Sequence, residues 1–509
     1  MQQTKKMFNL FAISEARNVL FGIATLWIGL FHSDGLSVSH YTDNQFLIDA
    51  FGFFKGTGNV GVDMFLFLSG IGLFFSFSKD SNVVSFWKKR LMRVLPSAFL
   101  ICTFYVCFRY VNGRFTSGFE YFFSRMTFTY FFIRGERVFW FISLILALYI
   151  VFPIFYKVIE RFRWKGMVGL IVLVVAFTMF LRAFKPGVYA NIEIALCRVP
   201  VFIIGIWAGK FVMGKKEINI NWLFAFLGVA IASLVFLGCF SDIMKGAIPN
   251  YSKEVDEIRW IFLYRYASCP LGISLVVLDS YVITELRKRG QCNLLRNFFE
   301  FVGMYSMEYY MIYLNVNHYL ERIYDIDSQH LIMLYFGSFV ISLVLCVLVR
   351  KVCDFFMAYM QRKPKNPVDQ TADGLSMRWY NFLIYVGLYI VAMLYAFMGI
   401  AAFYDPQIVL GISYLLIAAL AVVIRIYLGN RRWIGSVLLY VMIAAMGALR
   451  LLSDRILLHT ILGGGKKAIL TALVIAAITA AVVYANMRYF EKRKSMFEDA
   501  EMAEIKETE

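Results

Sequence analysis

Residues 59–78 read NVGVDMFLFLSGIGLFFSFS, an apolar run in which Asp63 is the only charged residue. About 20 predominantly apolar residues in a helix span the roughly 30 Å hydrocarbon core of a bilayer. The run therefore predicts a transmembrane helix with a carboxylate inside the membrane. An ionisable side chain in that position is costly and usually faces a bundle interior or an aqueous cavity.

Similar apolar runs recur along the whole chain. Hydrophobic residues make up 60% of the 509 residues and charged residues 17%, against about 45–50% and about 25% in soluble globular proteins. This composition excludes soluble globular, disordered, collagen-like and disulfide-stapled secreted proteins, and it predicts an all-α integral membrane protein. The predicted spans are 18–34, 59–78, 94–111, 138–156, 166–182, 194–210, 221–240, 259–283, 298–316, 329–349, 379–404, 408–427, 433–452 and 466–487.

The distribution of basic residues predicts the sidedness of these spans. Lys and Arg concentrate in alternate loops, such as 79–93 and 284–297, whereas the intervening loops hold few. Basic loops face the cytoplasm, and an even number of spans places both termini on one side. We therefore predict a multi-pass protein of the cell membrane, surrounded by the lipid bilayer, with both termini cytoplasmic. The net charge of +17 then needs no nucleic-acid partner.

A change in composition divides the chain into two membrane modules. Residues 10–350 contain ten predicted spans rich in Phe, Tyr and Trp, and residues 351–378 form a polar, Pro-containing cytoplasmic linker. Four Ala-rich spans follow in 379–490, and residues 491–509 form an acidic cytoplasmic tail. We predict a ten-helix bundle followed by a four-helix membrane appendix whose role the sequence does not indicate.

His32 and Asp63 are candidate catalytic residues. His32 ends the first predicted span and Asp63 lies near the start of the next, so adjacent spans place both toward the outer side. A carboxylate beside an imidazole can orient it and stabilise its protonated form, as a general base requires. The alternatives are an interfacial histidine held by a backbone carbonyl, and a helix N-terminal charge favoured by the helix dipole.

Arginines at the cytoplasmic end are candidate ligands for a phosphorylated substrate. Arg17 precedes His32 by fifteen residues, or about 22 Å along a helix. A substrate held at Arg17 that reacts at His32 must therefore be long and thin. Arg90 and Arg93 follow the second span in a basic loop. All three arginines also fit a second interpretation, in which they only set topology.

Two further charged residues lie within or beside later spans. Arg198 begins the sixth span and Glu308 lies at mid-depth in the ninth. They are candidate substrate-binding residues; alternatively, Glu308 forms a structural ion pair with Arg198 or Arg265. Gly205 and Gly209 have the small-xxx-small spacing of close helix packing. The cysteines and histidines show no metal-binding spacing, so we predict no metal site.

Six strings, in order, resemble the acyltransferase 3 family of membrane O-acyltransferases over about residues 10–350. They are the first-span histidine, GVDMFLFLSG (61–70), FWKKRLMRVLP (86–96), FWFISLILALYIVFP (139–153), RVPVFIIGI (198–206) and FVGMYSMEYYMIYL (301–314). Two positions depart from the family pattern. The family arginine usually stands eleven positions before the histidine, where this chain has Phe21, and many members have histidine at the position of Tyr313. Arg17 lies one helical turn before Phe21 and can replace the missing arginine.

The resemblance implies transfer of an acyl group, commonly acetyl, from cytoplasmic acyl-CoA to a hydroxyl of an extracytoplasmic acceptor, commonly a surface glycan. His32 is then the catalytic histidine, acting as general base or acyl carrier, with Asp63 beside it. The other expected substrate-binding residues are Arg17, Arg90, Arg93, Trp140, Arg198 and Glu308. Acyl-CoA is expected as the donor substrate, with no bound cofactor.

Two other classes of function remain open from the sequence. In a transporter, Asp63, Arg198 and Glu308 would line a permeation path, although no pair of corresponding Gly/Pro-broken helices is found in two halves. In an assembly protein, the appendix would recruit a glycan-synthesis partner. Acylation of an exported acceptor that depends on acyl-CoA distinguishes the enzyme from both.

Overall fold

The computed structural model describes residues 7–33, 36–111, 124–247, 253–323 and 331–361. The chain divides into two compact units: residues up to Cys102 with Phe123–Cys353, and Thr103–Phe122 with Asp354–Glu509. Of the second unit only the ends of two helices are described. The predicted appendix 379–490 and the tail 491–509 lie outside the described residues, as does most of the linker 351–378.

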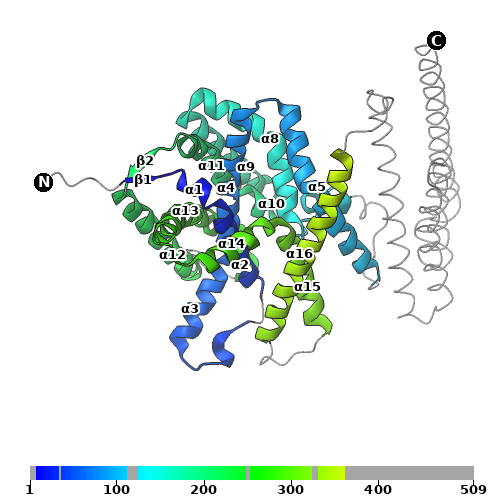
Figure 1. Ribbon diagram of the computed structural model, residues 1–509. Helices are drawn as coiled ribbons and strands as arrows, with labels where there is room; N and C mark the ends of the chain where they lie inside the picture. Colours follow the sequence, from blue (N-terminus) through cyan, green and yellow to red (C-terminus); the bar gives the residue numbers. More distant parts are fainter. Residues whose placement is uncertain (1–6, 34–35, 112–123, 248–252, 324–330, 362–509) are drawn as a thin grey trace, which may run out of the picture. The chain divides into compact units, whose positions relative to one another are not determined.

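The first unit is a bundle of helices with one small sheet (Figure 1). Its longer helices are α2 (Arg17–Phe31), α3 (Gln45–Gly56), α4 (Val60–Lys79), α5 (Val83–Val111), α8 (Trp140–Phe162), α9 (Trp164–Phe184), α10 (Pro186–Leu196), α11 (Val199–Met213), α12 (Asn221–Ala247), α13 (Lys253–Lys288), α14 (Asn293–Met304), α15 (Ser306–Ile323) and α16 (Leu331–Gln361). Short elements are β1 (Met7–Asn9), α1 (Ala12–Glu15), η1 (Val38–His40), η2 (Thr57–Asn59), α7 (Tyr130–Arg134) and β2 (Glu217–Asn219).

Seven helical segments in the described residues are long and apolar enough to cross a membrane. They are Gln45–Lys79, Trp140–Phe162, Trp164–Phe184, Pro186–Met213, Asn221–Phe240, Trp260–Lys288 and Leu334–Asp354, and α2 is a shorter apolar helix. Each of the ten spans predicted in 10–350 falls on helical structure. The molecule is therefore a mostly helical, multi-pass membrane protein.

Two predicted spans are wrong in detail, and several elements were not predicted. The segment 194–210 is divided between α10 and α11 at Cys197 and Arg198. The segment 298–316 is not one helix, because the chain breaks at Tyr305 between α14 and α15. The helix α3 lies between the predicted spans 18–34 and 59–78, where no helix is predicted. Its large apolar side chains, such as Phe46, are exposed. The strands β1 and β2 pair antiparallel with Met7 opposite Asn219, so the start of the chain is attached beside the loop after α11.

Glycines bring the central helices into direct contact. A methyl group added at Gly70 of α4 would collide with the carbonyl of Phe202, and one at Gly205 of α11 with the carbonyl of Phe67. Gly209 likewise lies against Phe74, which confirms that Gly205 and Gly209 form a packing face. Close approach of backbones replaces the hydrophobic driving force that helices in lipid lack.

A second close crossing fixes α2, the helix that begins at Arg17. A methyl group at Gly22 would collide with the carbonyl of Phe299, and one at Gly303 with the carbonyl of Asn18. The two glycines thus let α14 lie directly on the first half of α2. Since α4 and α15 also pack on α2, this helix is held on several sides and can present its two ends at defined positions.

Candidate functional site

An elongated cavity of about 870 Å³, open mouth included, runs between α2, α4, α5, α8 and α15. We call it the arginine cavity, because Arg17, Arg90 and Arg93 line it together. The remainder of its lining is mostly apolar and aromatic: Phe21, Ile28, Val62, Phe65, Ser69, Leu73, Val94, Phe141, Ile142, Ile145, Tyr149, Ser306, Met307 and Tyr310. One cavity therefore combines a cationic group of side chains with an apolar wall.

The three arginines lie together for identifiable structural reasons. Arg17 is the first residue of α2, and its guanidinium lies against Gly72, where an added methyl group would come within 2.6 Å of it. The start of α5 is attached to α8 by the Trp87 indole N–H, which donates to the Tyr149 carbonyl at 2.9 Å. Arg90 and Arg93 follow one and two turns later on α5.

None of the three arginines forms an ion pair within the residues that the structure describes. The Nε atoms of Arg17 and Arg90 are buried and have no hydrogen-bond partner there. Buried charges in proteins are normally paired, and three neighbouring cations repel one another. The arrangement is that of a site for an anion with several negative charges, such as a phosphorylated ligand.

His32 lines a smaller space of about 270 Å³, open mouth included, which we call the histidine chamber. Its other lining residues are Thr25, Ile28, Gly29, Phe65, Ser306, Tyr309, Tyr310, Tyr313 and Leu314. His32 caps the C-terminus of α2, where its backbone N–H donates to the Ile28 carbonyl at 3.2 Å. The next residue, Ser33, shares a hydrogen bond of 3.0 Å with the hydroxyl of Tyr313.

The two spaces adjoin, because Ile28, Phe65, Ser306 and Tyr310 line both. Arg17 and His32 stand at opposite ends of the single helix α2, a separation of about 22 Å. The lining is therefore continuous from the arginines to the histidine. Among the predicted site residues, the structure brings His32, Arg17, Arg90 and Arg93 to this path.

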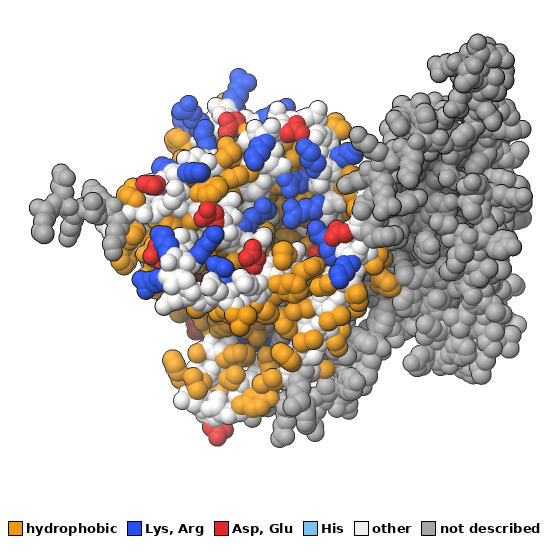
Figure 2. Space-filling model, in the orientation of Figure 1, with side chains coloured by type: hydrophobic (Ala, Val, Ile, Leu, Met, Phe, Trp, Pro, Cys, Tyr) orange, Lys and Arg blue, Asp and Glu red, His pale blue; other side chains and the backbone are white. Residues whose placement is uncertain are grey.

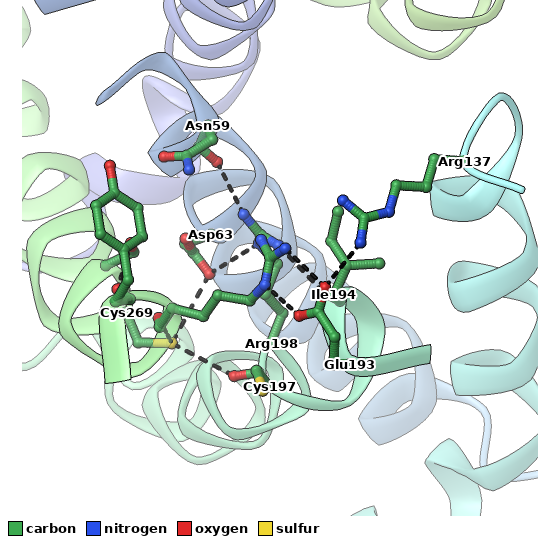
Figure 3. Close-up of polar contacts among 11 residues, drawn as sticks. Asn59, Asp63, Arg137, Glu193, Ile194, Cys197, Arg198 and Cys269 are labelled. Carbon is green, nitrogen blue, oxygen red and sulfur yellow. Dashed lines mark hydrogen bonds and ion pairs between the residues drawn. The ribbon is translucent and has the colours of Figure 1, made fainter. Parts of the chain in front are cut away.

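Asp63 lies in a different place from the one expected for a partner of His32. It is fully buried and lines neither the arginine cavity nor the histidine chamber. Its Oδ1 is 3.5 Å from the Nε of Arg198 and accepts a weak bond from the Cys269 thiol at 3.7 Å. Figure 3 shows Asp63 among these residues. The structure thus supports a buried ion pair at Asp63.

Arg198 is positioned by the break between α10 and α11. It is the N-cap residue of α11, and Pro200 follows within the first turn, where proline favours helix initiation. Its guanidinium donates to the carbonyl of Ile194 at 3.1 Å and stands 5.5 Å from the centre of the Trp140 ring. Trp140 and Arg198 therefore belong to the ion-pair cluster around Asp63 and line neither of the two spaces.

A second buried pair, Glu193 with Arg265, completes this cluster (Figure 3). The Nε and Nη2 atoms of Arg265 both donate to the Glu193 carboxylate. A guanidinium nitrogen of Arg137 lies 3.0 Å from the same carboxylate. The sequence indicated Arg265 as a charge within a span but missed Glu193. Glu193 lies in α10, just before the predicted span at 194–210, and a carboxylate beside an apolar run was the available signal.

Glu308 pairs with neither Arg198 nor Arg265, so that predicted alternative is wrong. The carboxylate of Glu308 accepts from Ser97 at 2.9 Å and from Arg350 at 3.1 Å. The predicted partners are both occupied, Arg198 by Asp63 and Arg265 by Glu193. Glu308 therefore links α15 to α5 and α16, and it lines neither of the two spaces.

Comparison with known proteins gives the family of the chain. Residues 18–351 match the model of the acyltransferase 3 family, described as an acyltransferase domain, and the chain belongs to this family. The match covers the body that holds the arginine cavity and the histidine chamber, and it confirms the resemblance found in the sequence. No curated protein and no solved structure matches the chain.

Proposed function

We propose that this protein transfers an acyl group from cytoplasmic acyl-CoA to a hydroxyl group of an extracytoplasmic acceptor, as an O-acyltransferase. The observation that carries the proposal is the continuous lining to His32 from three arginines that have no ion-pair partner among the described residues. The family match supports acyl transfer as the class of reaction. A surface glycan is the proposed acceptor, because its hydroxyls can approach from the outer side of the membrane.

The shape of the path suits acyl-CoA. Its phosphates are the anions that Arg17, Arg90 and Arg93 would bind, since charge-assisted hydrogen bonds from arginine to phosphate are strong and geometrically specific. The thin pantetheine arm would pass between the apolar and aromatic side chains of α2, α4 and α8. Its thioester would then lie near His32, about 22 Å away along α2.

At that position His32 would act as general base. The acceptor hydroxyl oxygen forms a bond to the thioester carbonyl carbon while its proton passes to the His32 imidazole. The carbon–sulfur bond breaks, and the proton on His32 returns to the departing CoA thiolate. The imidazole could also carry the acyl group covalently between donor and acceptor, and both routes use the same histidine.

The distribution of charge supports a cytoplasmic location for the arginine end. In Figure 2, Lys and Arg side chains gather over the upper half of the visible face, and hydrophobic side chains over the lower half. Basic residues of membrane proteins concentrate on the cytoplasmic side. This asymmetry supports the proposed orientation of the described helices, in which acyl-CoA enters among the basic residues on the cytoplasmic side.

The transporter alternative gains no support from the positions of Asp63, Arg198 and Glu308. It needed Asp63, Arg198 and Glu308 to line one permeation path, whereas each is held in a buried ion pair with a neighbouring side chain. The three residues do not line the arginine cavity or the histidine chamber.

Replacing Arg17 with alanine is expected to weaken acyl-CoA binding. A hydrogen bond to a charged group contributes about 1.5–3 kcal/mol, so the Kd for acetyl-CoA should rise roughly 10–100-fold, as measured by titration of purified protein in nanodiscs. Lys88→Ala is the matched control, because Lys88 is an exposed cation on the same side that does not line the arginine cavity. Equal affinities for the wild type and Arg17→Ala would show that this arginine only sets topology.

A further inference from the structure

The far side of the histidine chamber is a pair of stacked tyrosine rings. The rings of Tyr309 and Tyr313 lie 5.0 Å apart at an angle of 15°. Both side chains are buried, with exposed fractions of 3% and 5%. Gly29 of α2 lies directly opposite, and a methyl group added there would come within 3.2 Å of the Tyr309 hydroxyl. The chamber is therefore narrow between α2 and α15.

Three of the five hydroxyl groups that line the chamber are engaged with other parts of the protein. The Tyr310 hydroxyl donates to the Val138 carbonyl at 3.3 Å, and the Thr25 hydroxyl to the Phe21 carbonyl at 2.7 Å. The Tyr313 hydroxyl is bonded to Ser33. A sugar needs unsatisfied donors and acceptors, because buried polar groups without partners are costly. The chamber wall instead offers hydrocarbon and ring faces, which suit an acyl chain.

We propose that the histidine chamber holds the acyl chain of the donor. The Tyr309–Tyr313 stack closes the far end of this chamber, so that the protein selects short acyl groups such as acetyl. This inference rests on the proposed function, since it assigns a place to the acyl group of the same acyl-CoA. Tyr309 is a specificity-determining residue in this account, and the reacting atoms remain the thioester, the acceptor hydroxyl and the His32 imidazole.

The geometry explains why the limit on the length of the acyl chain would be sharp. The stack is fixed by ring contact and by the hydrogen bond between the hydroxyls of Tyr313 and Ser33. It is also buried between α2 and α16, since Tyr309 contacts Phe339 with ring centres 5.9 Å apart. Well-packed interiors do not yield readily to added methylene groups. A hydrophobic pocket can discriminate by about 10–200-fold for a single methylene.

The test measures transfer from acetyl-, butanoyl- and hexanoyl-CoA by wild type and variants in nanodiscs. The wild type is expected to prefer acetyl-CoA. Tyr309→Leu removes the ring from the wall and leaves more room for the acyl chain. It should raise the ratio of kcat/KM for hexanoyl-CoA to that for acetyl-CoA by at least about 10-fold. Tyr309→Phe keeps the ring and should keep the wild-type ratio. Tyr281→Leu, at a tyrosine that packs on Phe8 away from the chamber, is the matched control and should also keep it.

Gly29→Ala should change the size of the same chamber in the opposite direction. It provides an independent test if the Tyr309→Leu variant does not fold. The added methyl group narrows the chamber and should reduce butanoyl transfer more than acetyl transfer. An unchanged chain-length preference in folded Tyr309→Leu or Gly29→Ala would overturn the inference while leaving the proposed function intact. No transfer by the wild type from any of the three donors would overturn the proposed function, and this inference with it.

Discussion

Replacing His32 with alanine is expected to reduce acyl transfer by about 10²–10⁴-fold, the usual contribution of a positioned general base. His32 lines the chamber at the end of the path that begins at the arginines. Without the imidazole, the acceptor hydroxyl has no base among the chamber residues to take its proton. The measurement is the rate of transfer of labelled acetyl from acetyl-CoA to acceptor by purified variants.

Two controls distinguish a loss of catalysis from a loss of folded structure. The His32→Ala protein should remain inserted and monodisperse and should bind acetyl-CoA with wild-type affinity, because Arg17, Arg90 and Arg93 are unchanged. Lys88→Ala removes an exposed cation that does not line the chamber and should retain full activity. Full activity in His32→Ala would contradict both the general-base and the acyl-carrier routes.

Replacing Arg198 with methionine is expected to destabilise the fold by about 3–5 kcal/mol, because it leaves Asp63 buried without its cation. The two side chains are 1% and 0% exposed. The free energy of unfolding in detergent, or the corresponding fall in Tm, measures the effect. The double variant Asp63→Leu/Arg198→Met should recover much of the loss, since replacing both members of a buried pair is often neutral.

The pair Lys89–Asp80 is the matched control for this prediction. Its charged atoms lie 2.9 Å apart, but the side chains are 63% and 41% exposed. The hydrogen bond from Lys89 lowers the pKa of the Asp80 carboxyl to about 2, so the pair is charged at neutral pH. Lys89→Met should nevertheless leave Tm unchanged, because exposed pairs contribute little. If Arg198→Met were as stable as the wild type, the buried pair would have no structural role.

The helices could be predicted from sequence because a membrane span needs a long apolar run, and that requirement is local. The same reasoning failed where a run contains two helices. The run 298–316 is predominantly apolar, yet the chain turns at Tyr305 so that α14 can cross α2 at Gly22 and Gly303. That break depends on close contact with another helix, which hydropathy does not report.

The candidate site could be predicted only in part for a similar reason. The distance from Arg17 to His32 follows from helix geometry within one span, and the structure keeps both on one lined path. Ion-pair partners depend on which helices are neighbours and how each is rotated. The sequence therefore identified Asp63, Arg198 and Glu308 as unusual charged residues. It did not predict that Asp63 pairs with Arg198 or that Glu308 pairs with Arg350.

The most direct test of the central claim is a structure of the wild-type protein in nanodiscs with an acetyl-CoA analogue that cannot transfer its acetyl group. The account predicts the phosphates at Arg17, Arg90 and Arg93, with the acetyl group in the histidine chamber beside His32. A second cleft, lined by α2, α13 and α14, carries Arg287 and Arg296. Density for the analogue in that cleft, or no bound analogue at saturating concentration, would contradict the account.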